Sequence, residues 1–547
     1  MVLDTDDQIW TISLGQRDTH LNRNPKYWVS PKGRSPVLKH AYVKISPLVF
    51  LLAVISAAEA QTTISAASCN VSDVQSALNK ITSNGTTVTV PAGSCTWTSG
   101  ITFSTPYSFT LAGMSAAAST NAQGNPATFN DLTLIVDGQS GGGGNNPAIG
   151  ITLTGSSSQV VRVTGLSFQG GNVVYNGELA VGGATGQARV DHNHFININD
   201  LAVSMYEPMT GVADHNIFDV PNGDVYNGIR VYNTGGDGFG DTPWTMPPGL
   251  GTGSFIFFEN NTFNNGFMND CEVGGAFVAR YNTFNALAPN QNLGIQSHAT
   301  GSQQRGRGCR AWEVYDNSVG GGGGSIISSV GFQTSGTGVW WGNTIANTKN
   351  DIVFDEDRDN SNTYQQSAPP NGWGYCGTAQ TGSLSAFDGN QSSTGYPCLD
   401  QIGRGQGDMI SGMWPTVLDT GHPGVYTGVW PNEVLQPVYI WMENFSGTGS
   451  IVSVSSGENN IQANRDYYVP VSPFTGATGT GYGTYASIPA TCTTGVAYWA
   501  TDKNQLYACT ATNTWALYYA PYTYPHPLVT GTSPAPPASL SGTILNN

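Results

Sequence analysis

The chain has 547 residues, of which 70 are glycine, 20 are Lys or Arg and 36 are Asp or Glu. Charged residues make up 10% of the chain, far below the ~25% of ordinary proteins. This excludes a coiled coil and a charged disordered protein. The formal net charge of −16 also argues against nucleic acid and anionic membrane surfaces as partners, because an acidic surface repels them. A polyanionic substrate would need a local basic cleft or a bridging cation.

We expect residues 1–60 to lie outside the fold. Lys39 and Lys44 precede the apolar run 46–60, which ends in the small-residue pattern Ala-Glu-Ala. This pattern is typical of a secretory signal peptide and is too short for a membrane span. Because the signal begins so late, we interpret the residues before about Val43 as a misassigned start; the alternative is a genuine, long n-region of the signal peptide. The expected mature chain begins near Gln61 and is secreted or held at the cell surface, without membrane insertion.

Eight cysteines follow the signal, an even number that favours disulfides in an exported chain. The simplest of the possible connectivities pairs them in sequence order, as Cys69–Cys95, Cys271–Cys309, Cys376–Cys398 and Cys492–Cys509. No Cys-x-x-Cys pair occurs, and no histidine flanks a cysteine pair, so a structural zinc site is not indicated.

A short motif recurs through the middle of the chain, usually with asparagine two positions before an apolar residue. Its copies end at Phe168, Phe195, Phe218, Phe263, Phe284, Val319 and Ile345, and the asparagines are Asn193, Asn216, Asn261, Asn282, Asn317 and Asn343. The repeat of roughly 21–27 residues, with short β-branched runs and tight turns, is the pattern of a parallel β-solenoid. We interpret the longer step from Phe218 to Phe263 as two coils.

Stacked coils place equivalent residues in columns, so the phenylalanines are expected to fill the interior and the asparagines to bond turn backbone groups. A helix carrying Val74, Leu78 and Ile81 on one face is expected to cap the first coil. The predicted division is a β-helix over 61–350, its continuation with long loops over 351–488, and a small aromatic-rich β unit with a flexible tail over 489–547.

A cluster of arginines in residues 304–313 is the first candidate site. Arg305, Arg307 and Arg310 would form a local positive surface on an acidic chain, suited to uronate carboxylates and enolate-like intermediates. The alternative is that Arg307 or Arg310 pairs with Glu313 or Asp316 on the surface. His298 precedes the cluster, and either assists proton transfer and holds substrate or is an ordinary loop histidine.

The run Val190-Asp-His-Asn-His-Phe resembles the Ile-Asp-His strand motif of pectate lyases, which are right-handed parallel β-helices. Arg305 and Arg310 resemble the two arginines of that family's Arg-x-Pro-x-x-Arg motif, although Arg307 stands where the family has proline. The resemblance implies that Arg305 is the Brønsted base and that Arg310 or Ca²⁺ neutralises the uronate. Residues 92–97 and 396–405 also resemble exported bacterial β-helix proteins of unassigned activity.

Carboxylates supply the metal and acid–base candidates. Asp191 and Asp214 share a column, followed by Glu259 and then Arg280, a further catalytic candidate; Asp270 and Glu272 precede Arg280. Paired carboxylates can bind Ca²⁺ or act as acid and base, and the alternative is a row of outward polar residues. Asp355, Asp357 and Asp359 have the alternating spacing of a Ca²⁺ loop, without glycine at the sixth position.

His192 and His215 share a column, where we favour a structural role. Trp244 and Trp373 lie in Gly/Pro loops and are the expected sugar-stacking aromatics. The sequence thus predicts a monomeric, secreted β-solenoid that cleaves acidic polysaccharide by β-elimination. The alternatives are a non-catalytic, glycan-binding adhesin and a glycoside hydrolase that uses Asp191 and Asp214.

Overall fold

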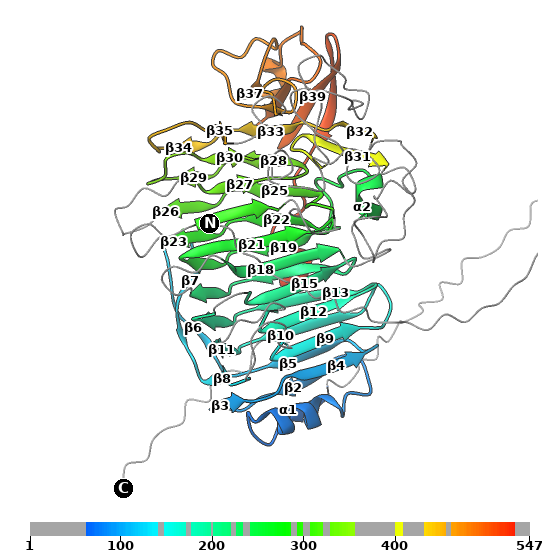
Figure 1. The fold of residues 1–547 in the computed structure, drawn as a ribbon, viewed down its shortest axis with the longest axis vertical. Coiled ribbons are helices and arrows are strands. Elements are labelled where there is room, and N and C mark those ends of the chain that lie inside the picture. The colour runs from blue at the N-terminus through cyan, green and yellow to red at the C-terminus, as the bar shows by residue number, and fades with distance from the viewer. Residues whose placement is uncertain are drawn as a thin grey trace, which may run out of the picture. The chain divides into compact units, whose positions relative to one another are not determined.

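The computed structural model describes residues 62–139, 147–170, 177–198, 201–219, 226–233, 241–285, 293–298, 307–320, 329–355, 400–408, 432–455 and 461–530. Three long, all-parallel sheets form its main body (Figure 1). Successive strands along the chain enter sheets A, B and C in turn, and each strand pairs with the strand one coil further on. The fold is therefore the expected parallel β-helix.

Sheet A has 12 strands and sheets B and C have 10 each. Sheet A contains β1 (Thr63–Ser65), β2 (Thr86–Thr89), β5 (Phe109–Ala112), β10 (Val160–Thr164), β13 (Gln187–Asp191), β16 (Thr210–Asp214), β19 (Ile256–Glu259), β22 (Ala276–Arg280), β25 (Ala311–Tyr315), β28 (Thr337–Trp341), β33 (Val438–Trp441) and β36 (Tyr467–Tyr468). Sheet B contains β3 (Gly93–Trp97), β8 (Thr133–Asp137), β11 (Ser167–Gln169), β14 (His194–Ile196), β17 (Ile217–Asp219), β20 (Thr262–Asn264), β23 (Thr283–Asn285), β26 (Ser318–Gly320), β29 (Thr344–Ile345) and β34 (Asn444–Phe445). Sheet C contains β4 (Ile101–Thr105), β9 (Ile149–Leu153), β12 (Leu179–Gly183), β15 (Val203–Glu207), β18 (Tyr226–Asn233), β21 (Gly266–Glu272), β24 (Leu293–Ser297), β27 (Gly331–Gln333), β30 (Ile352–Phe354) and β35 (Val452–Val454).

The predicted phenylalanine column fills the interior beneath sheet B. The rings of Phe168, Phe195, Phe218, Phe263 and Phe284 stack in sequence, and their centroids are 5.3, 5.0, 4.6 and 5.1 Å apart. One expectation was wrong. β17 pairs directly with β20, so the step from Phe218 to Phe263 is one coil, lengthened by a long connection, and not two.

The predicted asparagine column forms a continuous hydrogen-bonded ladder at the turn from sheet A to sheet B. The side-chain amide of each asparagine donates to the side-chain oxygen of the next, at 3.0–3.2 Å, from Asn193 through to Asn343. The same oxygen also accepts the backbone N–H of the preceding asparagine. The ladder thus satisfies polar groups that are shielded from water inside each turn.

The residue before each ladder asparagine turns the corner in a left-handed conformation. The φ angles are 52° at His192, 54° at His215, 57° at Asn260 and 58° at Tyr281. Side chains at this position project from the edge between sheets A and B, and equivalent residues of successive coils stand next to one another.

Other elements cover the ends and sides of the stack. Helix α1 (Val71–Leu78) packs Val74 and Leu78 into the core beside the first coils, as expected. The remaining elements are the hairpin β6 (Ala116–Thr120) and β7 (Pro126–Asn130), α2 (Asp241–Thr245), the pair β31 (Arg404–Asp408) and β32 (Asn432–Leu435), β37 (Thr480–Gly483), η1 (Tyr485–Ser487), β38 (Ala497–Ala500), β39 (Gln505–Ala511), β40 (Thr514–Tyr519) and α4 (Pro527–Thr530).

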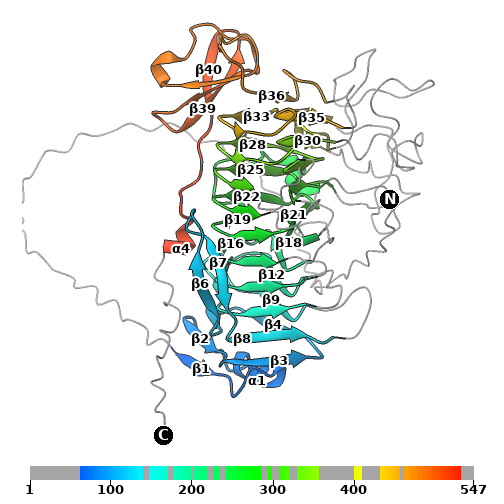
Figure 2. The ribbon, with the colours of Figure 1, turned by 90° about the vertical axis from the view of Figure 1, so that its left-hand side faces the viewer.

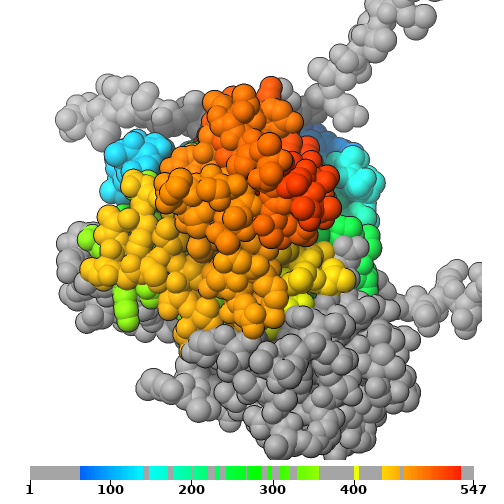
Figure 3. All heavy atoms as spheres, turned by 90° about the horizontal axis from the view of Figure 1, so that it is seen from above, coloured from blue at the N-terminus to red at the C-terminus, as the bar shows by residue number. Residues whose placement is uncertain are grey.

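The three strands expected in the C-terminal unit are β38, β39 and β40, and β37 joins them in a mixed four-stranded sheet. Seen from above, residues of this unit lie over part of the end of the stack (Figure 3). After β40 the chain turns back and runs beside sheet A as far as α4 (Figure 2). We call residues 520–530 the C-terminal strap.

Three of the predicted disulfides are present, namely Cys69–Cys95, Cys271–Cys309 and Cys492–Cys509. Cys376 and Cys398 lie outside the described residues. The disulfides agree with folding in an oxidising compartment. Among the described residues, no helix is both long and apolar enough to cross a membrane.

Candidate functional site

Five ionisable side chains meet on the outward face of sheet C. Strand alternation directs Ile229 and Val231 of β18 into the core, and Arg230 and Tyr232 outward. On β21, Asp270 pairs in register with Arg230, and Glu272 pairs with Tyr232. His298 follows β24, and its backbone N–H bonds to the carbonyl of Cys271, which places it next to Glu272. We call Arg230, Tyr232, Asp270, Glu272 and His298 the sheet C cluster.

The two carboxylates of the cluster share their hydrogen-bond donors. The Tyr232 hydroxyl lies 2.8 Å from Glu272 Oε2 and 3.2 Å from Asp270 Oδ2. Arg230 Nε donates to Asp270 Oδ2 at 3.2 Å, and its guanidinium lies 4.6 Å from the centre of the Tyr232 ring. His298 Nδ1 contacts Glu272 Oε1 and lies 3.5 Å from Asp270 Oδ1. Each group is therefore oriented by at least one other member.

Burial and charge together set the ionisation of the cluster. Burial alone would raise the pKa of Asp270, but His298 and Arg230 lower that pKa to about 2. Burial would lower the pKa of His298, but Glu272 and Asp270 raise it well above its ordinary value. Burial also raises the pKa of Tyr232 well above its ordinary value. At neutral pH the cluster thus holds an imidazolium, a guanidinium, an Asp270 carboxylate and an un-ionised phenol.

A disulfide lies directly beneath the cluster. Cys271 stands between Asp270 and Glu272 on β21, points into the core and is bonded to Cys309. The backbone N–H of Cys309 in turn donates to the carbonyl of His298 at 3.0 Å. The disulfide therefore ties together the strand that carries the carboxylates and the segment that carries the histidine.

The acidic groups of this cluster could also hold a metal ion. Ligand atoms of Asp270, Glu272 and His298 lie within 4.8 Å of one another. An imidazole together with two carboxylates suits a transition metal better than Ca²⁺, which prefers oxygen ligands alone. The positive charges of Arg230 and the His298 imidazolium already face these carboxylates, so Ca²⁺ is not needed to balance their charge.

The predicted arginine cluster does not form an open basic surface in the described residues. Arg307 is fully buried and forms an ion pair with Asp400 at 2.6 Å. Arg310 donates to the backbone carbonyls of Pro243 and Met246. Arg307 and Arg310 were both expected to contact substrate, but in the structure their side chains contact other parts of the protein. Arg305 lies outside the described residues.

Trp244 is not the exposed sugar-stacking residue that its Gly/Pro surroundings predicted. Its side chain is completely buried, with Nε1 donating to the carbonyl of Gly308 at 3.0 Å. The guanidiniums of Arg307 and Arg310 lie 4.7 and 5.2 Å from its ring centre. Trp244, which belongs to α2, thus packs that helix against the arginine segment, and Trp373 lies outside the described residues.

Arg280 belongs to sheet A and not to the sheet C cluster. It is fully buried, donates to Glu259 at 2.9 Å and to the Tyr315 hydroxyl at 2.8 Å, and bonds the backbone carbonyls of Tyr522 and Thr523 in the C-terminal strap. The strap therefore covers the residue that the sequence had suggested as catalytic, and its contacts are those of a structural anchor.

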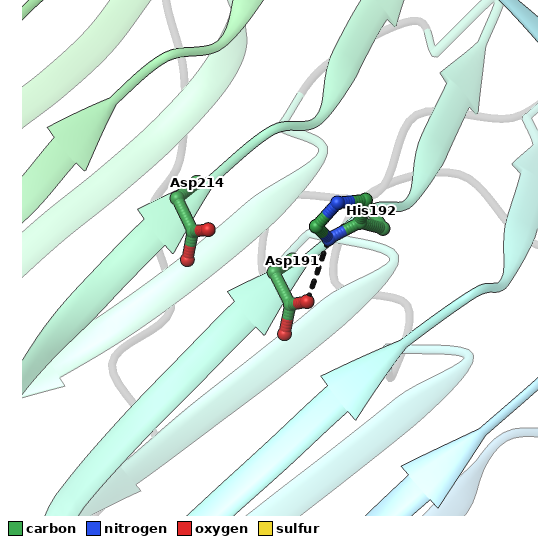
Figure 4. A group of neighbouring side chains, drawn as sticks. All are labelled: Asp191, His192 and Asp214. Carbon is green, nitrogen blue, oxygen red and sulfur yellow. Dashed lines mark hydrogen bonds and ion pairs between the residues drawn. The ribbon is translucent and has the colours of Figure 1, made fainter. Parts of the chain in front are cut away.

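Asp191 and Asp214 end neighbouring strands of sheet A, side by side as predicted (Figure 4). Both are fully buried. Arg162 donates to both oxygens of Asp191, at 2.7 and 2.6 Å, and Arg189 to both oxygens of Asp214, at 2.9 and 2.8 Å. Burial would raise the pKa of Asp191, but Arg162 and His192 lower it far below its ordinary value. Guanidiniums thus occupy the positions that Ca²⁺ would need.

The acidic segment after β30 is only partly described. Asp355 is half-buried, and its backbone N–H donates to the carbonyl of Gln333 at 3.1 Å. Asp357 and Asp359 lie outside the described residues.

Sequence reasoning identified His298, Asp270 and Glu272 as candidates but missed Arg230 and Tyr232. A signal was available in β18, where Ile-Arg-Val-Tyr alternates apolar and polar residues in a chain with few charges.

No protein-family model matches this chain, and the comparisons with curated proteins and with solved structures give no match either.

Proposed function

We propose that the protein is an exported enzyme that cleaves uronate-containing polysaccharide by β-elimination at the sheet C cluster. The observation that carries this proposal is the convergence of two cations, two carboxylates and a phenol on one outward face of a β-helix. Polar side chains that merely face solvent on a strand do not need to share hydrogen-bond donors in this way. Perturbed pKa values that arise from specific partners are typical of functional sites.

β-Elimination needs a cation to neutralise the uronate carboxylate, a base for the adjacent proton and an acid for the leaving oxygen. Arg230 and His298 supply the positive charge. Glu272 is the proposed base and takes the proton from the carbon next to the carboxylate. Tyr232 is the proposed acid and gives its hydroxyl proton to the departing glycosidic oxygen, which leaves a double bond in the uronate.

The contact between Tyr232 and Glu272 allows the site to reset. After cleavage, Glu272 carries a proton and Tyr232 has lost one, and their oxygens lie 2.8 Å apart. Direct transfer of the proton from Glu272 back to Tyr232 restores the starting state. The raised pKa of Tyr232 keeps its proton in place until the leaving oxygen accepts it.

An aromatic ring lies beside the cluster. Tyr206 pairs in register with Tyr232 one coil earlier on sheet C. Its side chain lies over Gly182, where an added Cβ would come within 2.8 Å of the Tyr206 Cβ. Because apolar sugar faces stack on aromatic rings, Tyr206 takes the role that the sequence had suggested for Trp244.

The resemblance to pectate lyases supports the substrate class only by analogy of fold and of two short motifs. It would make Arg305 the base and Ca²⁺ the neutralising ion. Our proposal assigns these roles to Glu272 and to the pair Arg230 and His298. An assay in Ca²⁺ and in EDTA distinguishes the two assignments.

A glycoside hydrolase is the second candidate, because Asp270 and Glu272 both contact the one Tyr232 hydroxyl. Two carboxylates this close together suit a retaining hydrolysis. An inverting hydrolysis needs a wider separation, because a water molecule must fit between the carboxylate and the sugar.

The test is incubation of the exported chain with pectate, alginate and glycosaminoglycans. Ultraviolet absorbance from unsaturated chain ends supports the lyase. New reducing ends without that absorbance favour the hydrolase, and binding without cleavage favours an adhesin.

Two near-isosteric variants test the assignments within the site. Glu272→Gln and Tyr232→Phe should each lower kcat by at least about 100-fold, whereas Tyr281→Phe, on the edge between sheets A and B, should not. Full activity in both site variants would disprove the proposed acid and base.

A further inference from the structure

We propose that Asp137 and Glu178 together bind one Ca²⁺ ion at the corner between sheets B and C. Asp137 ends β8, and Glu178 immediately precedes β12. Because β8 pairs with β11 and β9 pairs with β12, the two residues occupy this corner in consecutive coils. Both residues are buried, with 6% and 1% of their surfaces exposed.

The carboxylate oxygens at this corner lack partners. Asp137 Oδ1 accepts the backbone N–H of Gln139 at 2.9 Å. Asp137 Oδ2 and both oxygens of Glu178 have no hydrogen-bond partner among the described residues. A single shared proton could join two of these three oxygens, but it would leave the third oxygen unpaired and one negative charge buried. Buried polar groups are nearly always paired, and a buried charge needs an opposite one.

No cationic side chain in the described part of the chain offsets the charge of Glu178. Burial, followed by the charge of Asp137, raises the pKa of Glu178 to about 8, and no cation acts to lower it. Several buried carboxylates elsewhere do face a cation, in the ion pairs Arg162–Asp191, Arg280–Glu259 and Arg307–Asp400. An added ion would supply at this corner the positive charge that a guanidinium supplies in those pairs.

The donor set selects the kind of ion. Two carboxylates carry two negative charges and offer oxygen ligands alone, which suit Ca²⁺ better than a transition metal. Mg²⁺ demands a nearly regular octahedron, whereas Ca²⁺ accepts the irregular coordination that a corner of the stack provides. Ala148 and Ala202 stand at the position of Glu178 in the coils before and after it. No large side chain of its own column is therefore stacked against Glu178, and backbone or water oxygens would complete the coordination.

The same column provides a variant that tests the site. Because alanine occupies this position in both neighbouring coils, Glu178→Ala should fold while removing one carboxylate. Asp137→Asn keeps Oδ1 as the acceptor for Gln139 but removes the charge. Asp351→Asn is the matched control, because Asp351 is a buried carboxyl group that immediately precedes β30 of sheet C, as Glu178 precedes β12.

The experiment compares thermal unfolding of the exported chain in Ca²⁺ and in EGTA, with Ca²⁺ binding measured by calorimetry. With Ca²⁺ at about 100 times its dissociation constant, the ratio of folded to unfolded wild type should rise about 100-fold. Asp137→Asn should bind Ca²⁺ at least about 10-fold more weakly, because affinity follows the charge of the ligands. Glu178→Ala should gain no stability from Ca²⁺, and Asp351→Asn should respond as the wild type does.

The absence of a Ca²⁺-dependent shift in the wild type, or an equal shift in Glu178→Ala, would overturn the proposal. Loss of the shift in Asp351→Asn would also overturn it, because the ion would then depend on a different corner. The measurement requires no substrate, so its result is independent of the proposed cleavage reaction. Glu178→Ala also serves as a control for cleavage assays in EDTA, because it lacks this ion and retains the sheet C cluster.

Discussion

Glu443 accepts two hydrogen bonds from Asn343, one from its backbone N–H and one from its side-chain amide, each at 3.3 Å. It thereby occupies the place that asparagine holds in the preceding coils. The segment Met442-Glu-Asn-Phe445 is a further copy of the repeat, with glutamate in the ladder position. The asparagine ladder therefore ends on a buried carboxyl group.

The ladder should contribute strongly to stability at its centre. Asn261 bonds Asn282, the carbonyl of Ala213 and two donors of Asn216. Asn261→Ala would leave several buried groups unpaired, so we expect a loss of about 3 kcal/mol in unfolding free energy, measured by urea denaturation. Asn264→Ala, a half-buried site on the following strand, should change stability by less than about 1 kcal/mol. Equal effects at both sites would contradict the importance of the ladder.

The ladder's end should make stability depend on pH. Asp351 and Glu443 are buried carboxyls that interact with each other. Burial raises the pKa of Asp351 to about 7 and that of Glu443 well above its ordinary value. A pKa raised on folding stabilises the protein below the unfolded pKa, and this stability is lost as pH rises through the folded pKa.

We therefore expect unfolding free energy to decrease between about pH 4 and pH 7, by about 1.4 kcal/mol per pH unit for each such proton. Burial, followed by the charge of Asp137, raises the pKa of Glu178 to about 8 and extends the decrease. Asp351→Asn should flatten the profile measured by thermal unfolding in this range. An unchanged slope would show that Asp351 is ionised in the native state.

The sequence could predict the features that repeat from coil to coil. A phenylalanine or asparagine column can be recognised in the sequence because each coil repeats the same environment. Each further copy of the motif makes the assignment of the other copies more secure. The pairs Cys69–Cys95 and Cys271–Cys309 were predictable for a related reason, since residues about one coil apart in sequence are neighbours in space.

The sheet C cluster could not be assembled from the sequence, because its members come from three coils joined by connections of different length. Register between those strands depends on pairing that no local pattern reveals. Arg307 was misjudged for the same reason, since its partner Asp400 is 93 residues away. A charged residue near a turn gives no sign of such a distant partner.

The C-terminal strap should be needed for the stability of sheet A. Arg280 bonds the strap carbonyls of Tyr522 and Thr523, and the backbone N–H of His526 donates to Glu259 at 2.7 Å. Arg280→Met removes one partner of a buried ion pair, and we expect it to cost about 3–5 kcal/mol in denaturant unfolding. The exposed Lys503→Met in the C-terminal sheet serves as the control.

If Arg280→Met unfolded at the same denaturant concentration as the wild type, the strap would cover sheet A without contributing to its stability. Limited proteolysis gives a second measurement. The variant should be cleaved faster within residues 520–530, because the strap loses two of its anchoring hydrogen bonds.

The disulfide beneath the sheet C cluster should link folding to the candidate site. Cys271 and Cys309 are 38 residues apart, and closing a loop of this size is worth about 2–4 kcal/mol. We expect Cys271→Ser/Cys309→Ser to lose that amount of unfolding free energy. The double variant should also lower kcat for any polysaccharide cleavage. Asp270 and Glu272 flank Cys271 in the sequence, and the backbone N–H of Cys309 donates to the carbonyl of His298.

Removing Cys492–Cys509, which lies in the C-terminal unit, should affect stability but leave kcat unchanged. If both double variants lost stability equally and neither changed kcat, the disulfide would be structural alone, and the positions of Asp270, Glu272 and His298 would not depend on it.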